Sequence, residues 1–428
     1  MILFLASRPV VPRPRPSRRP RPTVRSPRQA RVAFLAPYRR LFTAPGSLAF
    51  TLAGLLGRLP GSMLGVSMVL MIALTRDSYA LAGAVSAAGI AVTAAAQPLL
   101  GRLVDRHGQA KVAVPAVAVF AAGATAMLLC VHYEAPAWTL FVCAAGSSGM
   151  PGLGAMTRAR WAAIYADDAA ARHTATSFEQ VVDELCFMLG PALAMVLCTA
   201  AFPEAGLLTA TALLVLGTLL FATQRATEPA PHPREPRTDD KDRSPLRHPG
   251  LRTVAVTFLA TGAVFGSMEV ATVAAVESYG DGSASGAILA LQAGGSCLAG
   301  LVFGALPVRG SATARFIAGV AAMAVAMLPL LAADGLGSLA VCLVLAGMAT
   351  APTMINGMTL VQRLTPAARL TESITTTYTG LLIGISAGAA AGGWSVEHFG
   401  PTNGYATPAI AAALALAAAV AGARRLRG

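Results

Sequence analysis

Long apolar stretches alternate with short polar ones along most of the chain. The apolar stretches reach about 20 residues or more, the length an α-helix needs to cross the roughly 30 Å hydrocarbon core of a bilayer. The pattern therefore predicts an all-α transmembrane protein with twelve spans, at residues 46–74, 78–100, 112–131, 136–157, 175–200, 204–223, 252–277, 283–306, 314–332, 336–360, 372–394 and 404–423.

The composition agrees with a protein embedded in a lipid bilayer. Apolar residues make up 55% of the chain, charged residues only 12%, and the mean hydropathy is +0.61, which is outside the usual range for soluble domains. The net charge of +13 raises the question of a nucleic-acid partner. The basic residues lie between apolar stretches and not on one soluble face, so we expect no nucleic acid to bind.

The distribution of Lys and Arg predicts the orientation. An even number of spans places both termini on one side, and nearly all basic residues then fall on that side, except Arg76 and Arg58. Cytoplasmic segments of membrane proteins are enriched in Lys and Arg. We therefore expect a multi-pass protein of the inner (cytoplasmic) cell membrane with both termini in the cytoplasm.

Composition also divides the chain into two halves with polar flanks. Residues 1–45 carry eleven arginines, no acid and repeated Arg-Pro, a composition that predicts a disordered basic cytoplasmic tail. A tail that contacts anionic lipid and an inert extension fit this composition equally. We expect six-helix bundles at residues 46–223 and 252–423, a cytoplasmic linker at 224–251, and a basic cytoplasmic end at 424–428.

A charged, glycine-bounded turn separates the second and third predicted spans. It reads Gly101-Arg102-Leu103-Val104-Asp105-Arg106-His107-Gly108-Gln109-Ala110-Lys111. The pattern Gly-x-Leu-x-Asp-Arg-x-Gly-x-x-Lys resembles the signature loop between helices 2 and 3 of the major facilitator superfamily of secondary transporters. An ordinary basic cytoplasmic turn is the alternative.

The resemblance implies a fold and a mechanism. The fold has two six-helix halves related by a pseudo-two-fold repeat, and the second half does repeat the first weakly, with Gly61-Ser62-Met63 matching Gly266-Ser267-Met268. Such transporters work by alternating access, in which the halves rock around a site near the midplane. The resemblance thus implies a monomeric transporter of a small molecule, not an enzyme, and with no cofactor or metal.

The resemblance also implies that the signature loop is a conformational latch. In the family, the aspartate of this loop pairs with charged groups at the cytoplasmic edge of helix 4, so Asp105 is expected to pair with Arg158 or Arg160. It is also expected near the amino-terminal end of span 11, where the helix dipole favours an anion. The latch residues are Gly101, Arg102, Asp105, Arg106, Gly108, Lys111, Arg158 and Arg160.

Charged residues inside the predicted spans are candidates for substrate and proton coupling. An arginine near the centre of a membrane costs roughly 2.5–3.5 kcal/mol unless it faces water or an acid, and Arg58 lies almost at the centre of span 1. Span 5 carries three acids, of which Asp183 and Glu184 lie at a matching depth, while Glu179 shares a helix face with Asp183. We expect the coupling site to include Arg58, Glu179, Asp183, Glu184 and, from the opposite half, Glu269. A static salt bridge that only neutralises buried charge is the alternative.

The direction of transport is read from one partial motif. Gly190-Pro191 in span 5 resembles part of a motif of the family's proton-coupled exporters, although the following Ala-Leu-Ala departs from it. We interpret the chain as a bacterial, proton-coupled exporter of a small organic compound. The alternatives are uptake of a small anionic metabolite bound by Arg58, a receptor or scaffold with the transporter fold, and a membrane-embedded transferase, for which the sequence lacks a metal or diphosphate motif.

Small residues predict where helices approach closely. Span 11 carries Gly380, Gly384, Gly388 and Gly392, and this four-residue period gives one smooth helix face. Span 2 has small residues at the same period. Because these two helices meet across the halves in the family, we expect the glycine face to pack against span 2.

Overall fold

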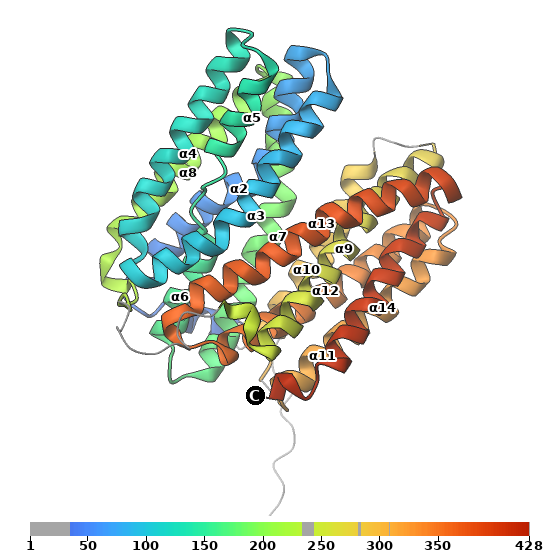
Figure 1. Cartoon of the computed structure of the whole chain (residues 1–428). Helices are drawn as coiled ribbons and strands as arrows, with labels where there is room; N and C mark the ends of the chain where they lie inside the picture. Colours follow the sequence, from blue (N-terminus) through green and yellow to red (C-terminus); the bar gives the residue numbers. More distant parts are fainter. Residues whose placement is uncertain (1–34, 233–243, 281–283, 308, 428) are drawn as a thin grey trace, which may run out of the picture.

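The computed structural model describes residues 35–232, 244–280, 284–307 and 309–427 as a helical protein with two bundles side by side (Figure 1). The first bundle contains α2 (Ser47–Arg76), α3 (Tyr79–His107), α4 (Gln109–His132), α5 (Ala137–Gly146), α6 (Leu153–Ile164), α7 (Ala169–Ala200) and α8 (Ala205–Thr223). The second contains α9 (Pro249–Ser278), α10 (Ser285–Ala305), α11 (Ala312–Met327), α12 (Leu336–Leu364), α13 (Leu370–Phe399) and α14 (Ala406–Ala421).

The fourth predicted span is a broken helix. Of the described helices, eleven are long and apolar enough to cross a membrane, whereas the predicted span at 136–157 consists of α5 and α6 with an irregular stretch between them. That stretch contains Pro151, which has no backbone N–H, and two glycines, and such residues interrupt a helix. Ser148 donates a hydrogen bond to the Gly89 carbonyl of α3 at 3.0 Å, which holds the break against its neighbour.

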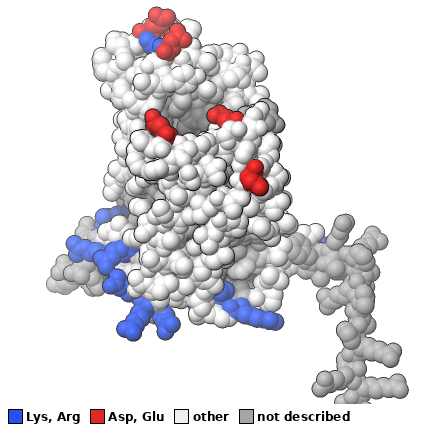
Figure 2. Space-filling view, turned by 90° about the vertical axis from the view of Figure 1, so that its right-hand side faces the viewer, with Lys and Arg blue, Asp and Glu red and all other residues white. Residues whose placement is uncertain are grey.

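The two bundles meet at one end of the molecule and diverge at the other (Figure 1). They touch where α3 meets α13 and where α7 meets α10 and α12. The C-terminus lies at the closed end, and in Figure 2 most of the visible Lys and Arg gather there. The visible acids lie nearer the other end, and some of them lie beside a hollow. We call the closed end the basic end and the other the open end.

Part of the predicted tail is folded against the basic end. Residues 35–41 are helical, the Leu41 side chain is fully buried, and Tyr38 is only 7% exposed. Apolar residues at helical spacing give this segment a face to bury, which the arginine-rich composition around it conceals. Residues 1–34 of the predicted tail lie outside the described residues.

The start of the predicted linker is also packed on the protein. The Glu228 carboxylate accepts a hydrogen bond from the backbone N–H of Ala110 at 3.0 Å, in the first turn of α4, where unpaired N–H groups attract an anion. The backbone N–H of His232 donates to the carbonyl of Asp105 at 2.9 Å. Residues 224–232 therefore stay with the first bundle, and residues 233–243 of the predicted linker lie outside the described residues.

The expectation that the glycine face of α13 packs against span 2 is wrong. This face packs within its own half. Side chains added at Gly380, Gly384, Gly388 and Gly392 would meet Ala255, Leu259, Ala263 and Ser267 of α9. The backbones of α9 and α13 therefore lie close enough to exclude a Cβ atom, as in other small-residue helix pairs in membranes. The α3–α13 contact instead depends on Gly101, where a Cβ would meet Thr375 and Glu372.

We predict that Gly384→Ala destabilises the second bundle. The added methyl group would collide with the carbonyl oxygen of Leu259, whereas at Gly393, on the same helix, a Cβ would meet nothing within 4 Å. Overpacking of this kind costs about 1–3 kcal/mol, while Gly393→Ala should be neutral or stabilising. Thermal unfolding of the purified variants in detergent checks this, and equal melting temperatures for the two would contradict the close packing.

Candidate functional site

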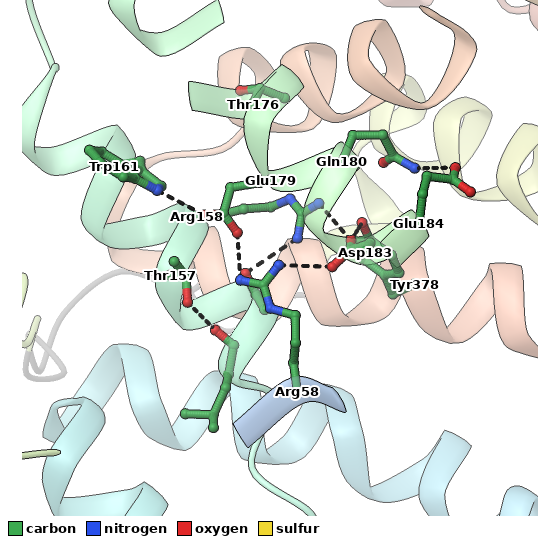
Figure 3. Close-up of polar contacts among 12 residues, drawn as sticks. Arg58, Thr157, Arg158, Trp161, Thr176, Glu179, Gln180, Asp183, Glu184 and Tyr378 are labelled. Atoms are coloured by element: carbon green, nitrogen blue, oxygen red, sulfur yellow. Dashed lines mark hydrogen bonds and ion pairs between the residues drawn. The ribbon is translucent and has the colours of Figure 1, made fainter. Parts of the chain in front are cut away.

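Four charged side chains from three helices form a buried cluster inside the first bundle (Figure 3). Arg58 of α2 contacts both acids of α7, with Nη2 2.5 Å from Glu179 Oε2 and Nη1 2.9 Å from Asp183 Oδ1. Arg158 of α6 contacts the second of these acids, with Nη2 2.7 Å from Asp183 Oδ2. Glu179 and Asp183 can share Arg58 because residues four apart lie on one face of a helix.

Two aromatic side chains complete the hydrogen bonds of the acids. Trp161 Nε1 donates to Glu179 Oε1 at 2.8 Å, and the Tyr378 hydroxyl donates to Asp183 Oδ2 at 2.8 Å. The guanidinium of Arg158 also lies over the Tyr378 ring, 5.3 Å from its centroid. Because Tyr378 belongs to α13, the cluster of the first bundle is directly bonded to the second.

The charges of the cluster balance, and its side chains are almost fully buried. The cluster holds two guanidinium and two carboxylate groups, and the side chains of Glu179, Arg158 and Asp183 are 1%, 2% and 11% exposed. Burying a charge is costly unless it is paired, so the mutual pairing makes this position possible. Among the described residues, the Nε atoms of Arg58 and Arg158 are buried without a hydrogen-bond partner, so the pairing is not complete.

Glu184 lies apart from the cluster, although it follows Asp183 directly. Its Oε1 accepts hydrogen bonds from Gln180 Nε2 at 3.0 Å and from Ser296 Oγ of α10 at 2.9 Å. Ser296 in turn accepts one from Thr350 of α12 at 3.2 Å. One step along a helix turns the side chain by about 100°, which directs Glu184 toward the second bundle and away from Arg58 (Figure 3).

Glu269 is not brought to either group. It is exposed on α9, and in the described part of the chain it makes no hydrogen bond or ion pair that the structure records. The structure therefore joins Arg58, Glu179 and Asp183, links Glu184 to the opposite half, and leaves Glu269 outside.

The signature loop meets the second bundle at a helix end. Asp105 Oδ1 and Oδ2 accept hydrogen bonds from the backbone N–H groups of Thr371 and Glu372, at 3.1 and 2.9 Å. Both N–H groups belong to the first turn of α13, which lacks a cap from its own N-cap residue. Asp105 thus caps α13 from the other half of the protein.

The expected partners of Asp105 in α6 have other roles. Arg158 pairs with Asp183, and Arg160 is fully buried and donates to Gln109 Oε1 at 2.7 Å and to the Gln224 carbonyl at 2.8 Å. Its guanidinium carbon lies 3.8 Å from the ring centroid of Phe221. Residues two apart face opposite sides of a helix, so neither arginine of α6 is directed at Asp105.

Comparison with known proteins places these features in a family. A model of the Major Facilitator Superfamily matches residues 50–333, more than half of the chain. The chain belongs to this superfamily. It is therefore a secondary transporter of a small molecule across a membrane and not an enzyme, which confirms the resemblance seen in the signature loop.

Solved structures of other transporters show the same fold over most of the chain. The human organic anion transporter MFSD10 (TETRAN) has a TM-score of 0.66 and 16% identity, covering 90% of this chain and 99% of its own. A bacterial homologue of the iron transporter ferroportin, in its outward-facing state, has a TM-score of 0.65 and 15% identity, and the match covers 89% of this chain and 98% of the homologue. The E. coli fucose:proton symporter FucP has a TM-score of 0.64 and 14% identity, and the match covers 91% of this chain and 99% of the symporter. No curated protein sequence matches the chain.

The remaining motif residues of this superfamily member support its helix contacts. Gly108 has φ of 96° in the turn between α3 and α4, a value that favours glycine. Arg102 and Arg106 lie near the Glu372 carboxyl group, and Lys111 is exposed in the first turn of α4. Gly190 lets α7 approach Ser62 of α2, and Pro191 follows within the same helix.

Sequence reasoning did not identify Tyr378, Trp161 or Ser296 as site residues. All three are neutral, so the cost of burying charge gives no signal for them. The only available signal was the unmet hydrogen-bonding capacity of the acids, since a buried carboxylate needs more donors than Arg58 alone can supply.

We predict strong energetic coupling between Arg58 and Glu179. Removing one member of a buried ion pair costs about 3–5 kcal/mol because it leaves a charge uncompensated. Arg58→Met combined with Glu179→Gln should therefore cost less than the sum of the single changes by more than about 1 kcal/mol. Unfolding free energies of the four proteins test this, with Glu269→Gln as a control expected within about 0.5 kcal/mol of the parent. Additive effects would show that the pair is not coupled.

Proposed function

We propose that this superfamily member is a proton-coupled exporter of a small organic compound and that Glu184 is the group that carries the proton. The supporting observation is that Glu184 is half-buried in a membrane span, accepts hydrogen bonds from two neutral groups, and joins α7 to α10. The other span 5 acids are held by arginines.

The difference in partners decides which acid can change its charge. If Glu179 or Asp183 gained a proton, a buried guanidinium would lose its counter-charge, which is costly. The hydrogen-bond partners of Glu184 are an amide and a hydroxyl, so this carboxyl can gain or lose a proton without leaving a buried cation unpaired. The cluster around Arg58 then serves as a fixed framework, and Glu184 serves as the titrating group.

The position of Glu184 couples its charge to the movement of the halves. Its bond to Ser296 crosses from the first bundle to the second, so rocking of the halves must break or remake it. A charged carboxylate loses more than a neutral acid when it loses a donor. Protonation of Glu184 therefore favours separation of α7 from α10, and deprotonation favours the arrangement seen here.

The proposed orientation sets the direction of proton movement, and export is the direction that we propose for the compound. The Lys and Arg residues gathered at the basic end (Figure 2) support placing that end in the cytoplasm, so that the hollow at the other end opens outward. A proton then enters from outside and leaves to the cytoplasm while the compound moves outward. Uptake of an anion bound by Arg58 is less well supported, since Arg58 and Arg158 are already neutralised by Glu179 and Asp183.

We propose further that Asp105 is a conformational latch and not a binding residue. It lies at the basic end, where it caps the first turn of α13. When the basic end opens, α3 and α13 separate and these two N–H groups lose their acceptor. Asp105 therefore stabilises the state that is closed at the basic end.

We predict that Glu184→Gln abolishes proton-driven flux while exchange of the compound continues. The compound is first identified from a panel of dyes, antibiotics and metabolites by comparing its accumulation in expressing and deleted cells, with and without an uncoupler. In proteoliposomes, the variant should show no response to a pH gradient but should still exchange labelled for unlabelled compound, because glutamine keeps the shape but cannot bind a proton.

The control for this experiment is Glu269→Gln, which removes an acid from the opposite half that contacts neither group. We expect this variant to keep proton-driven transport. Normal proton coupling in folded Glu184→Gln protein would refute the role of Glu184.

We predict that Asp105→Asn slows transport with little change in the affinity for the compound. An amide cannot supply two charged oxygens to the N–H groups of α13, and a helix-terminal charge interaction contributes about 0.3–1 kcal/mol, and up to about 2 when partly buried. The initial rate and the half-saturating concentration are measured in the same vesicles. A changed half-saturating concentration with an unchanged maximal rate would place Asp105 in the binding site.

A further inference from the structure

The segment before the first span crosses from one half of the protein to the other. We call residues 35–45 the strap. The hydroxyl group of Tyr38 in the strap donates a hydrogen bond to the carbonyl of Leu301 in α10, at 2.7 Å. An added Cβ at Gly304 would meet this hydroxyl, so the small residue leaves the room that Tyr38 uses.

The strap is anchored on the first half by apolar and aromatic contacts. Leu41 is fully buried, and the Phe42 ring packs edge-on against Phe178 and Trp161, at centroid distances of 5.4 and 6.0 Å. The hydroxyl of Tyr165 donates to the Leu41 carbonyl at 2.9 Å. These contacts hold the strap in place beside Trp161, the residue that donates to Glu179 in the buried cluster.

A surface ion pair adds little to this anchor. Arg40 Nη2 lies 2.9 Å from Asp168 Oδ2, with 68% of the arginine side chain exposed. The backbone N–H of Ala171 also donates to Asp168 at 2.9 Å, and this bond is the main reason that the pKa of Asp168 is lowered. Exposed ion pairs contribute little, so the apolar contacts dominate.

The strap acts near the carboxyl-terminal end of α10, on a carbonyl one turn before the last helical residue, Ala305. First-half residues supply donors to this last turn. Besides Tyr38, Thr174 donates to the Gly304 carbonyl at 2.9 Å, and His173 Nε2 lies 3.0 Å from the Phe303 carbonyl. A carbonyl can only accept, so this histidine nitrogen carries the hydrogen.

We propose that the strap is a second latch that keeps the basic end closed, independent of Asp105. Asp105 holds the amino-terminal end of α13 with a carboxylate, whereas the strap holds the carboxyl-terminal end of α10 with a hydroxyl group. Because Tyr38 is anchored to the first half and bonded to the second, it must leave Leu301 before α10 can move away. Opening of the basic end therefore requires the strap to detach, whatever compound is transported.

The test measures the separation of the halves and needs no substrate. Spin labels are placed at Thr223→Cys and Arg363→Cys, two exposed positions at the basic end of α8 and α12, after the six native cysteines are replaced by alanine. Distances are measured by double electron–electron resonance in lipid nanodiscs. Tyr38→Phe should raise the ratio of long to short distances about 2- to 10-fold, the effect of losing one hydrogen bond.

A second variant and two controls make the result decisive. A chain that begins at Arg39 keeps the anchors Leu41 and Phe42 and should shift the distances at least as far as Tyr38→Phe. Tyr79→Phe, which alters an exposed tyrosine at the open end, should change nothing. In the double variant Asp105→Asn with Tyr38→Phe, the ratio of long to short distances should rise by the product of the two single effects, because the two latches are independent. Unchanged distances in both strap variants would overturn the proposal, as would a shift equal to that of Tyr79→Phe.

Discussion

Neutralisation of charge inside the membrane is the constraint on which this structure depends. Arg58 lies in the middle of α2 with only 7% of its side chain exposed, and a charge there is tolerated only beside acids. Its two acids come from α7, and Arg158 of α6 completes the balance. These ion pairs fix the relative positions of the three helices. The irregular stretch before α6 contributes to this arrangement, because it places Arg158 at the depth of Asp183.

The contacts within each half differ in kind from those between the halves. Within the second half, the glycines of α9 and α13 pack backbone against backbone, and such packing is lost if the helices move slightly. Between the halves, the recorded bonds are directional. Some involve helix ends, such as the first turn of α13 at Asp105 and the last turn of α10 at Tyr38, and others lie further along the helices, such as those from Tyr378 to Asp183 and from Ser296 to Glu184. Bonds of this type can break and re-form as units, which suits two rigid bodies that rock.

The sequence predicted the features that follow from cost and length. Apolar length indicated eleven of the spans, and the price of a buried charge indicated that Arg58 lies near the span 5 acids. The sequence could not indicate which neighbouring helix a given helix face would contact. The glycine face of α13 meets α9, Arg158 and Arg160 meet different partners, and Tyr378 bonds to Asp183. The folding of the strap was not predicted, because arginines dominate the composition of residues 1–45 and the average hydropathy of the segment hides its few apolar residues.

In the mechanism that we propose, two adjacent acids, Asp183 and Glu184, separate support from titration on a single helix. The face that carries Asp183 points to two arginines of the first bundle, and Tyr378 of the second bundle also donates a hydrogen bond to this acid. The next residue points to the second bundle, and its two hydrogen-bond donors, Gln180 of the same helix and Ser296 of α10, are neutral. If both acids shared one arginine, a proton taken by either would weaken the support of the bundle itself. Since they lie on different faces, the charge of Glu184 can change while the ion pairs that hold α2, α6 and α7 remain intact.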